Sequence, residues 1–247
     1  MNNARPLTID AYRWGSRNRL SRILPGLVVV AGGAIAHAAE TPKTTGLDLT
    51  QAVVVAPDGL SGPERKAVTL LVEEVDRRTN LRWAVRPTPP DDAGAFIFVG
   101  TATTLEPFKS RLAGGPDGAP IEGKAEGYRV WSDAGRKSVF IQGNDPRGVL
   151  FGIGRLLREM RMERGRASVP ESFRVATAPQ YPLRGHQLGY RPKTNSYDGW
   201  DLGQWEQYIR DLAVFGTNTV ELIPPTSDDE GDSPHFPREP MEMMIGM

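Results

Sequence analysis

The chain contains no cysteine. Disulfide scaffolds and thiolate chemistry are therefore excluded, and the fold must be held together by its core. Acidic and basic residues are equal in number, 30 of each, and no basic run occurs after residue 38. Because binding to nucleic acid needs a concentration of positive charge, the sequence argues against DNA or RNA as a partner.

The N-terminal apolar stretch, residues 23–35, is too short to cross a membrane, which needs about 20 apolar residues. Arginines precede it, and residues 36–38 read Ala-His-Ala, the pattern of a signal-peptide cleavage site. The arginines are Arg13, Arg17, Arg19 and Arg22. We predict a signal peptide at 1–38, cleaved near Ala38. The mature protein would then be secreted or periplasmic and free of the membrane, the alternative being a membrane anchor.

Cleavage there would remove five arginines and one aspartate, leaving 25 basic and 29 acidic residues, a net charge of −4. Residues 39–50 are mostly polar and predict a flexible leader.

Residues 51–178 predict a domain that mixes strands and helices. The predicted strands are 51–56, 83–85 and 95–100, followed by a hairpin of 128–132 and 138–142. Helices are predicted at 63–78, after Ser61, and at 103–111, and a third helix begins at Pro146 and is capped by Asp145. Residues 113–123 are predicted to form a loop. This order indicates an α+β sandwich with a mixed sheet and helices on one face. The domain has no compact cluster of His, Asp or Glu, so we interpret it as a support domain.

Three glycines, Gly148, Gly152 and Gly154, lie inside the helix predicted from Pro146. Each costs about 1 kcal/mol relative to alanine in a helix interior. They predict a helix backbone that lies close against a sheet. A phosphate-binding loop is the alternative, but the spacing is not G-x-G-x-x-G.

Residues 183–223 predict a second fold, of the α/β class. The order is a strand at 183–190, a loop at 190–200, a helix at 201–215 and a strand at 220–223. This order is that of the first βαβ unit of a (β/α)₈ TIM barrel. Such a barrel needs roughly 250 residues, whereas about 25 residues follow Ile223. We therefore expect residues 179–247 to be the truncated start of a barrel.

Several side chains of this second region suit a carbohydrate. Arg184 offers a planar, permanently charged set of donors for sugar hydroxyls or a carboxylate, although a surface salt bridge is the alternative. The loop places aromatic rings beside hydrogen-bonding groups at the carboxyl end of the first strand, where barrel active sites form. Its candidates are Tyr190, Arg191, Asn195 and Trp200. The alternative is a solvated loop held down by its aromatic rings.

The helix predicted at 201–215 carries an apolar stripe that we interpret as core. Its members are Trp205, Tyr208, Ile209, Leu212 and Phe215. Asp228, Asp229 and Glu230 follow the second strand. Adjacent residues of an extended chain point to opposite sides, so the three carboxylates cannot converge on one metal ion. We predict neither a metal nor a cofactor.

Residues 143–157, Gly-Asn-Asp-Pro-Arg-Gly-Val-Leu-Phe-Gly-Ile-Gly-Arg-Leu-Leu, followed by Tyr-Pro-Leu-Arg-Gly at 181–185, resemble the secreted β-N-acetylhexosaminidases of glycoside hydrolase family 20. The chain also resembles family 84 and the N-terminal domain of family 67 α-glucuronidases. The family 20 resemblance implies an accessory domain before a (β/α)₈ barrel, and sugar-hydroxyl contacts from Arg184 and from Asp228 or Asp229. The histidines usual in the second strand are replaced here by Glu221 and Ile223.

In families 20 and 84 the acetamido group of the substrate acts as nucleophile, assisted by carboxylates after the fourth strand. The resemblance therefore implies no catalytic acid within this chain. The sequence predicts the N-terminal part of a secreted glycoside hydrolase that acts on a terminal sugar. The first candidate for this sugar is an N-acetylhexosamine, and we expect the chain to be inactive alone. The alternatives are an α-glucuronidase, a non-catalytic carbohydrate-binding module and a structural domain without a ligand.

Overall fold

The computed structural model of the chain describes residues 46–91, 94–187, 197, 199–222, 234 and 238–247. All of them fall within the unit formed by residues 42–247. The predicted signal peptide lies outside the described residues. No helix in the described ranges has both the length and the apolar character required to cross a bilayer.

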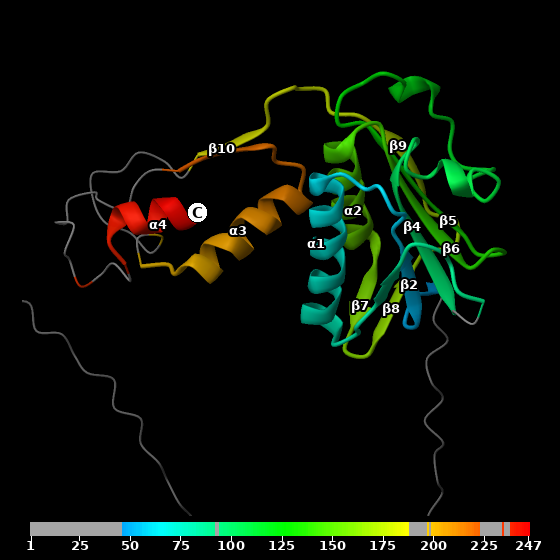
Figure 1. Cartoon of the computed structure of the whole chain (residues 1–247), viewed down its shortest axis with the longest axis horizontal. Helices are drawn as coiled ribbons and strands as arrows, with labels where there is room; N and C mark the ends of the chain where they lie inside the picture. The colour runs from blue at the N-terminus through cyan, green and yellow to red at the C-terminus, as the bar shows by residue number, and fades with distance from the viewer. Residues whose placement is uncertain (1–45, 92–93, 188–196, 198, 223–233, 235–237) are drawn as a thin grey trace, which may run out of the picture. The chain divides into compact units, whose positions relative to one another are not determined.

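A six-stranded mixed sheet forms the centre of the first domain (Figure 1). In spatial order its strands are β3 (Ala84–Arg86), β2 (Ala52–Val55), β4 (Ala95–Thr101), β6 (Ser138–Gly143), β5 (Tyr128–Asp133) and β9 (Arg174–Thr177). The first four are parallel, and β5 runs antiparallel to both β6 and β9. The predicted mixed sheet and the β5–β6 hairpin are confirmed.

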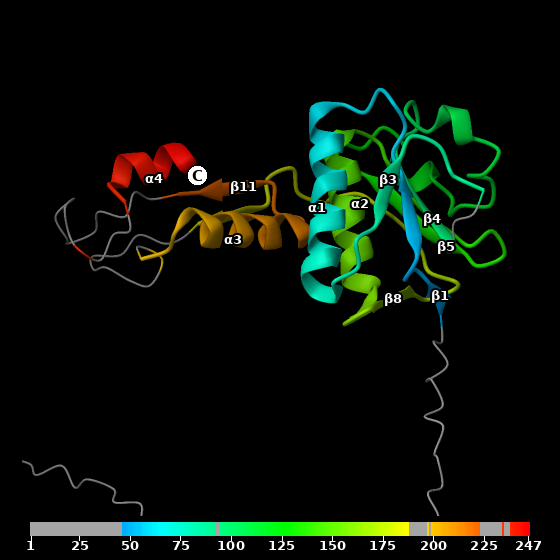
Figure 2. The same ribbon diagram turned by 60° about the horizontal axis from the view of Figure 1, so that its bottom comes forward.

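Helices α1 (Gly62–Thr79) and α2 (Pro146–Glu159) lie side by side on one face of this sheet (Figures 1 and 2). Both begin where the sequence predicts a cap. The Ser61 hydroxyl accepts from the Glu64 amide, and the Glu64 carboxylate accepts from the Ser61 amide in return. The Asp145 carboxylate accepts from the Gly148 amide at 2.7 Å. The main apolar core lies between these helices and the sheet.

The other face of the sheet carries a smaller aromatic core. Phe140 stacks between Phe98 and Trp131, with ring centroids 5.1 and 4.8 Å apart. A loop containing two 3-10 turns, η1 (Glu106–Phe108) and η2 (Ala119–Ile121), connects β4 to β5. The helix predicted at 103–111 is wrong, because only η1 forms there. Pro107 has no amide hydrogen for an α-helical bond to Thr103, which explains why no longer helix forms.

The three glycines of α2 lie at close approaches of the backbone. A Cβ on Gly148 would lie 2.3 Å from the Gly127 carbonyl oxygen, and one on Gly152 would lie 2.8 Å from Ile141. These two confirm the predicted approach to the sheet. A Cβ on Gly154 would lie 2.5 Å from the carbonyl oxygen of Val214, which belongs to another helix, so its partner was predicted wrongly.

A three-stranded antiparallel sheet, with order β1 (Leu47–Asp48), β8 (Arg166–Val169) and β7 (Arg161–Glu163), completes the domain. The predicted leader at 39–50 is therefore too long. Leu47 pairs with Val169 in the sheet, and Leu49 is fully buried. These two apolar side chains join the core because burying them outweighs the polar character of their neighbours.

The second region is a strand–helix–strand unit. Strand β10 (Gly185–Gln187) and strand β11 (Thr219–Glu221) pair in parallel, with helix α3 (Leu202–Val214) between them along the chain. Asp201 and Gln204 form a capping box, and Gly216 has a φ of +95° where the helix stops. The predicted parallel βαβ unit is confirmed. A further helix, α4 (Pro240–Gly246), follows.

Candidate functional site

Polar side chains line one face of the β10–β11 pair. His186 and Val220 lie opposite each other in register, and the His186 Nε2 atom lies 2.5 Å from the Tyr208 hydroxyl of α3. Because side chains alternate along a strand, Gln187 and Glu221 lie on the opposite face. Both are exposed and paired in register at the carboxyl ends of the strands. An amide and a carboxylate placed side by side can accept from and donate to hydroxyl groups.

Gln187 was not among the residues singled out in the sequence, and Glu221 was noted only as a substitution for histidine. The signal that would have found them is the two-residue period of Gly-His-Gln and Thr-Val-Glu, which places both on the face away from the helix.

Arg184 precedes β10 and lies at the amino-terminal edge of the parallel pair. Its guanidinium donates to the Glu126 carboxylate at 2.6 Å, to the Gly216 carbonyl at 2.8 Å and to the Tyr181 carbonyl at 2.9 Å. The guanidinium carbon also lies 5.0 Å from the ring centroid of Phe151. These contacts give Arg184 a structural role, and its contact with a sugar stays a prediction.

Glu126 is the centre of a small buried charge cluster. Its side chain is only 4% exposed. Besides Arg184, it binds the Arg147 guanidinium at 3.1 Å and the Asn218 amide at 3.3 Å. Its backbone amide donates to the Asp145 carboxylate at 2.7 Å. One carboxylate thus joins the loop before β5, the start of α2 and the segments before both β10 and β11.

Trp200 belongs to an aromatic cluster around the start of α3. Its ring lies edge-on to Trp205 and Tyr208, each with centroids 5.2 Å apart, and to Tyr197 at 4.9 Å. Burial raises the pKa of the Tyr208 hydroxyl, and the nearby Tyr197 raises it further. The half-buried Trp200 is therefore anchored by other rings, and its stacking against a sugar stays a prediction.

The apolar stripe predicted for α3 is correct at Trp205, which is 3% exposed, but wrong at Phe215, which is 71% exposed. Val214 is buried in its place and packs against Gly154. The helix ends at Val214, so Phe215 leaves the helical period and its ring lies beside Arg158 at 5.4 Å.

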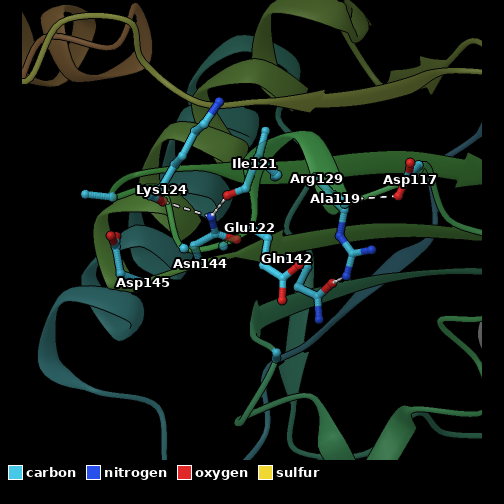
Figure 3. Close-up of a pocket in the computed structure, with 14 residues that line it drawn as sticks. Asp117, Ala119, Ile121, Glu122, Lys124, Arg129, Gln142, Asn144 and Asp145 are labelled. Atoms are coloured by element: carbon cyan, nitrogen blue, oxygen red, sulfur yellow. Dashed lines mark hydrogen bonds between the residues drawn. The ribbon is translucent and has the colours of Figure 1, made fainter.

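An open pocket of about 840 Å³ lies beside the carboxyl ends of β4 and β6, and Figure 3 shows the residues that line it. The Arg129 guanidinium donates to the Gln142 side chain and to the Pro116 carbonyl, both neutral acceptors. The Asn144 amide donates to the carbonyls of Ile121 and Lys124. The pocket thus presents a half-buried guanidinium whose acceptors carry no charge, a group able to bind a carboxylate or neighbouring hydroxyls.

All of the other predicted ligand residues lie outside the described residues. They are Tyr190, Arg191, Asn195, Asp228 and Asp229. Within the described ranges, no three His, Asp or Glu side chains converge as metal ligands would.

No family model matches the sequence, and no curated protein matches it. The structure is similar to solved glycoside hydrolases. A GH115 4-O-methyl-α-glucuronidase with specificity for decorated arabinogalactans gives a TM-score of 0.50 at 19% identity, over 69% of this chain and 24% of that one. A GH84 protein gives 0.49 at 14% identity, over 72% and 27%. The GH20 exo-β-N-acetylglucosaminidase from Vibrio harveyi gives 0.46 at 14% identity, over 69% and 21%.

The chain therefore spans between about a fifth and just over a quarter of the length of these structures. At these identities the similarity concerns the fold. The predicted resemblance to glycoside hydrolases is confirmed at that level, for a mixed α/β arrangement like that of part of such enzymes.

Proposed function

We propose that the described region is the accessory domain and first barrel βαβ unit of a secreted glycoside hydrolase that acts on a terminal sugar. The first candidate for this sugar is an N-acetylhexosamine. The observation that carries the proposal is the parallel pairing of β10 with β11 around α3, directly after a mixed-sheet domain. A parallel pair with a helical crossover is the repeating unit of a (β/α)₈ barrel. The resemblance of residues 143–157 and 181–185 to family 20 supports the same class.

The sugar would bind at the carboxyl ends of β10 and β11, because ligands of such barrels bind on that side. Gln187 and Glu221 are the described residues best placed there, and Trp200 lies in the segment between β10 and α3. The remaining candidates from the sequence are Arg184, Tyr190, Arg191, Asn195, Asp228 and Asp229. The proposal assigns no general acid or nucleophile to a described residue. In the substrate-assisted scheme of families 20 and 84, the carboxylates come from a later strand.

A binding experiment tests the site. Addition of N-acetylglucosamine to the ¹⁵N-labelled chain should shift backbone resonances of β10 and β11 and the Trp200 indole, and Glu221→Gln should abolish these shifts. Glu163→Gln, an exposed glutamate of β7, is the matched control and should leave them unchanged. Shifts confined to other residues, or shifts that survive Glu221→Gln, would refute the site.

Two assays distinguish the sugar classes. The chain should release no nitrophenol from nitrophenyl N-acetylglucosaminide or nitrophenyl glucuronide, because the proposal gives it no catalytic acid. If β10 and β11 respond to glucuronate and not to N-acetylglucosamine, the α-glucuronidase alternative is correct. Turnover of either substrate by the chain alone would contradict the absence of catalytic groups.

A carbohydrate-binding module without catalysis is the second candidate, and the pocket at Arg129 favours it. The guanidinium has neutral acceptors and stands in an open cavity. Trp131, 5.9 Å from that guanidinium, makes tryptophan fluorescence a suitable readout. Saturable quenching by N-acetylglucosamine oligomers that is lost in Arg129→Ala, but kept in Glu221→Gln, would establish the module.

Export is part of the proposal, with cleavage near Ala38 and delivery to the periplasm or medium. Expression of the full chain in a bacterial host with intact secretion should give a protein whose N-terminus, read by mass spectrometry, begins after Ala38. An uncleaved cytoplasmic product would refute this part alone.

A further inference from the structure

Glu126 has an unusual position for a glutamate. Its φ is +59°, in the left-handed region that residues other than glycine rarely adopt. Its side chain is nevertheless nearly fully buried. A buried carboxylate is tolerated only when cations and hydrogen-bond donors surround it. The residue therefore accepts both an unfavourable backbone and a buried charge.

The groups around Glu126 come from both parts of the chain. Arg147 is 62% exposed on its side-chain surface, so it is a weakly bound partner on the solvent side. The inner partners are Arg184, whose side chain is 22% exposed, and Asn218. These two precede β10 and β11, so the carboxylate binds the amino-terminal ends of both parallel strands.

The same two residues also bind each other through the backbone. The Arg184 amide donates to the Asn218 side-chain carbonyl at 2.9 Å, and the Asn218 amide donates to the Arg184 carbonyl at 3.1 Å. The Asn218 side-chain amide donates in addition to the Pro182 carbonyl at 2.8 Å. Glu126 therefore does not contact two independent side chains; it contacts the point where the strand pair begins.

Helix α3 meets the accessory domain through a second buried carboxylate. Glu74 of α1 has no exposed surface, and it accepts from Arg78 at 2.7 Å and from Gln207 of α3 at 3.3 Å. Arg78 also lies 3.6 Å from Asp211 of α3. Two fully or nearly buried carboxylates, one at the strand ends and one along the helix, hold the βαβ unit.

We propose that Glu126 is a positioning residue of the accessory domain: through Arg184 and Asn218 it sets where the parallel strand pair starts, and hence where its carboxyl-terminal rim lies. The inference concerns the placement of the strands, so it does not depend on which sugar, if any, binds at that rim. It gives the accessory domain a task beyond support, since a residue outside the βαβ unit determines the unit's orientation.

Hydrogen exchange measured by mass spectrometry on the mature chain tests this proposal. In Glu126→Gln the amide group would present donors to the two guanidiniums and remove the compensating charge. We expect exchange in the segments 181–187 and 202–221 to become at least about tenfold faster, as for a region that opens locally, while β4 and β6 stay protected. Glu126→Asp, which keeps the charge, should restore part of the protection.

Glu122→Gln is the matched control, because Glu122 lies in the same loop and is exposed. It should leave exchange unchanged everywhere. Asn218→Ala provides a second route if Glu126→Gln does not fold, because it removes the partner of the carboxylate from the other side. Unchanged exchange at 202–221 in both variants, or acceleration of equal size in β4 and β6, would overturn the proposal.

Discussion

The mixed-sheet domain, which we propose to be an accessory domain, and the βαβ unit that follows it are stabilised in different ways. In the first, apolar side chains from both helices and the sheet are fully buried, among them Ile97, Ile141 and Leu156. In the second, the described residues from 181 onward include only three buried side chains: Trp205, Val214 and Met243. The difference shows that hydrophobic burial accounts for the stability of the first region. Burial alone cannot account for the position of the second region against the first.

Charged groups supply much of the remaining attachment. Arg210 of α3 binds Glu73 of α1 at 2.6 Å, besides the contacts of Glu74 and Glu126 already described. Val214 is the one buried side chain of α3 that joins the main core. A junction of this kind depends on pH and salt in a way that an apolar core does not, so the two regions are separable by experiment.

The largest effect is expected in the aromatic core of the accessory domain. Phe140→Ala removes a fully buried ring stacked between Phe98 and Trp131. Truncations of this kind cost about 3–5 kcal/mol. Denaturant unfolding followed by circular dichroism should show that loss. A loss below about 1 kcal/mol would mean that this face of the sheet is not a packed core.

A smaller effect is expected where the two regions touch. Gly154→Ala would place a Cβ 2.5 Å from the Val214 carbonyl oxygen, so α2 and α3 must separate. Overpacking of this kind costs about 1–3 kcal/mol, more than the gain of about 1 kcal/mol in helix propensity. Hydrogen exchange should accelerate in α3.

Gly62→Ala is the matched control for that change. Gly62 begins α1, and a Cβ there would contact nothing within 4 Å. This variant should be neutral or slightly stabilising in the same assay. If it destabilises as much as Gly154→Ala, the close approach to Val214 is not the cause.

The elements of both regions were largely predictable from local sequence, whereas the contacts between them were not. Ser61 with Glu64, and Asp145 before Pro146, mark the starts of α1 and α2 because each capping side chain lies three positions from the amide that it binds. The parallel pairing of β10 and β11 followed from a helix of the right length between two strands. Each of these signals is local.

Glu126 carries no such signal. It lies just after a glycine-rich and proline-rich loop without any period, and its partner Arg184 is 58 residues further along the chain. Arg184 was singled out as a sugar-binding candidate with a salt bridge as the alternative, and its ion pair with Glu126 depends on tertiary structure. The prediction that Phe215 is buried was wrong for a related reason. The helix ends one residue earlier than predicted, and this moves the Phe215 ring from the core to the surface.

Trp205→Ala tests most directly whether the two regions unfold independently. Trp205 is 3% exposed and packs with Met243 and the rings of Trp200 and Tyr208. We expect the exchange protection of α3 to fall while the unfolding free energy of the accessory domain changes by less than about 1 kcal/mol, because distant independent sites do not couple. A single cooperative loss in both regions would show that they unfold as one unit.

The smallest effect is expected from Glu206→Gln on the exposed face of α3. The hydrogen bonds and charge of Arg210 lower the pKa of Glu206 below its ordinary value of 4.5. Because the folded pKa is the lower one, the carboxylate stabilises the helix fully above about pH 4.5, and this contribution is lost as the pH falls through the folded pKa.

Exposed helix pairs of this type contribute only about 0.3–0.5 kcal/mol. The exchange of α3 amides should therefore differ slightly between Glu206→Gln and the unmodified chain at pH 7, and this difference should shrink as the pH falls through the folded pKa of Glu206. A difference that does not shrink as the pH falls would mean that the carboxylate acts through packing and not through its charge.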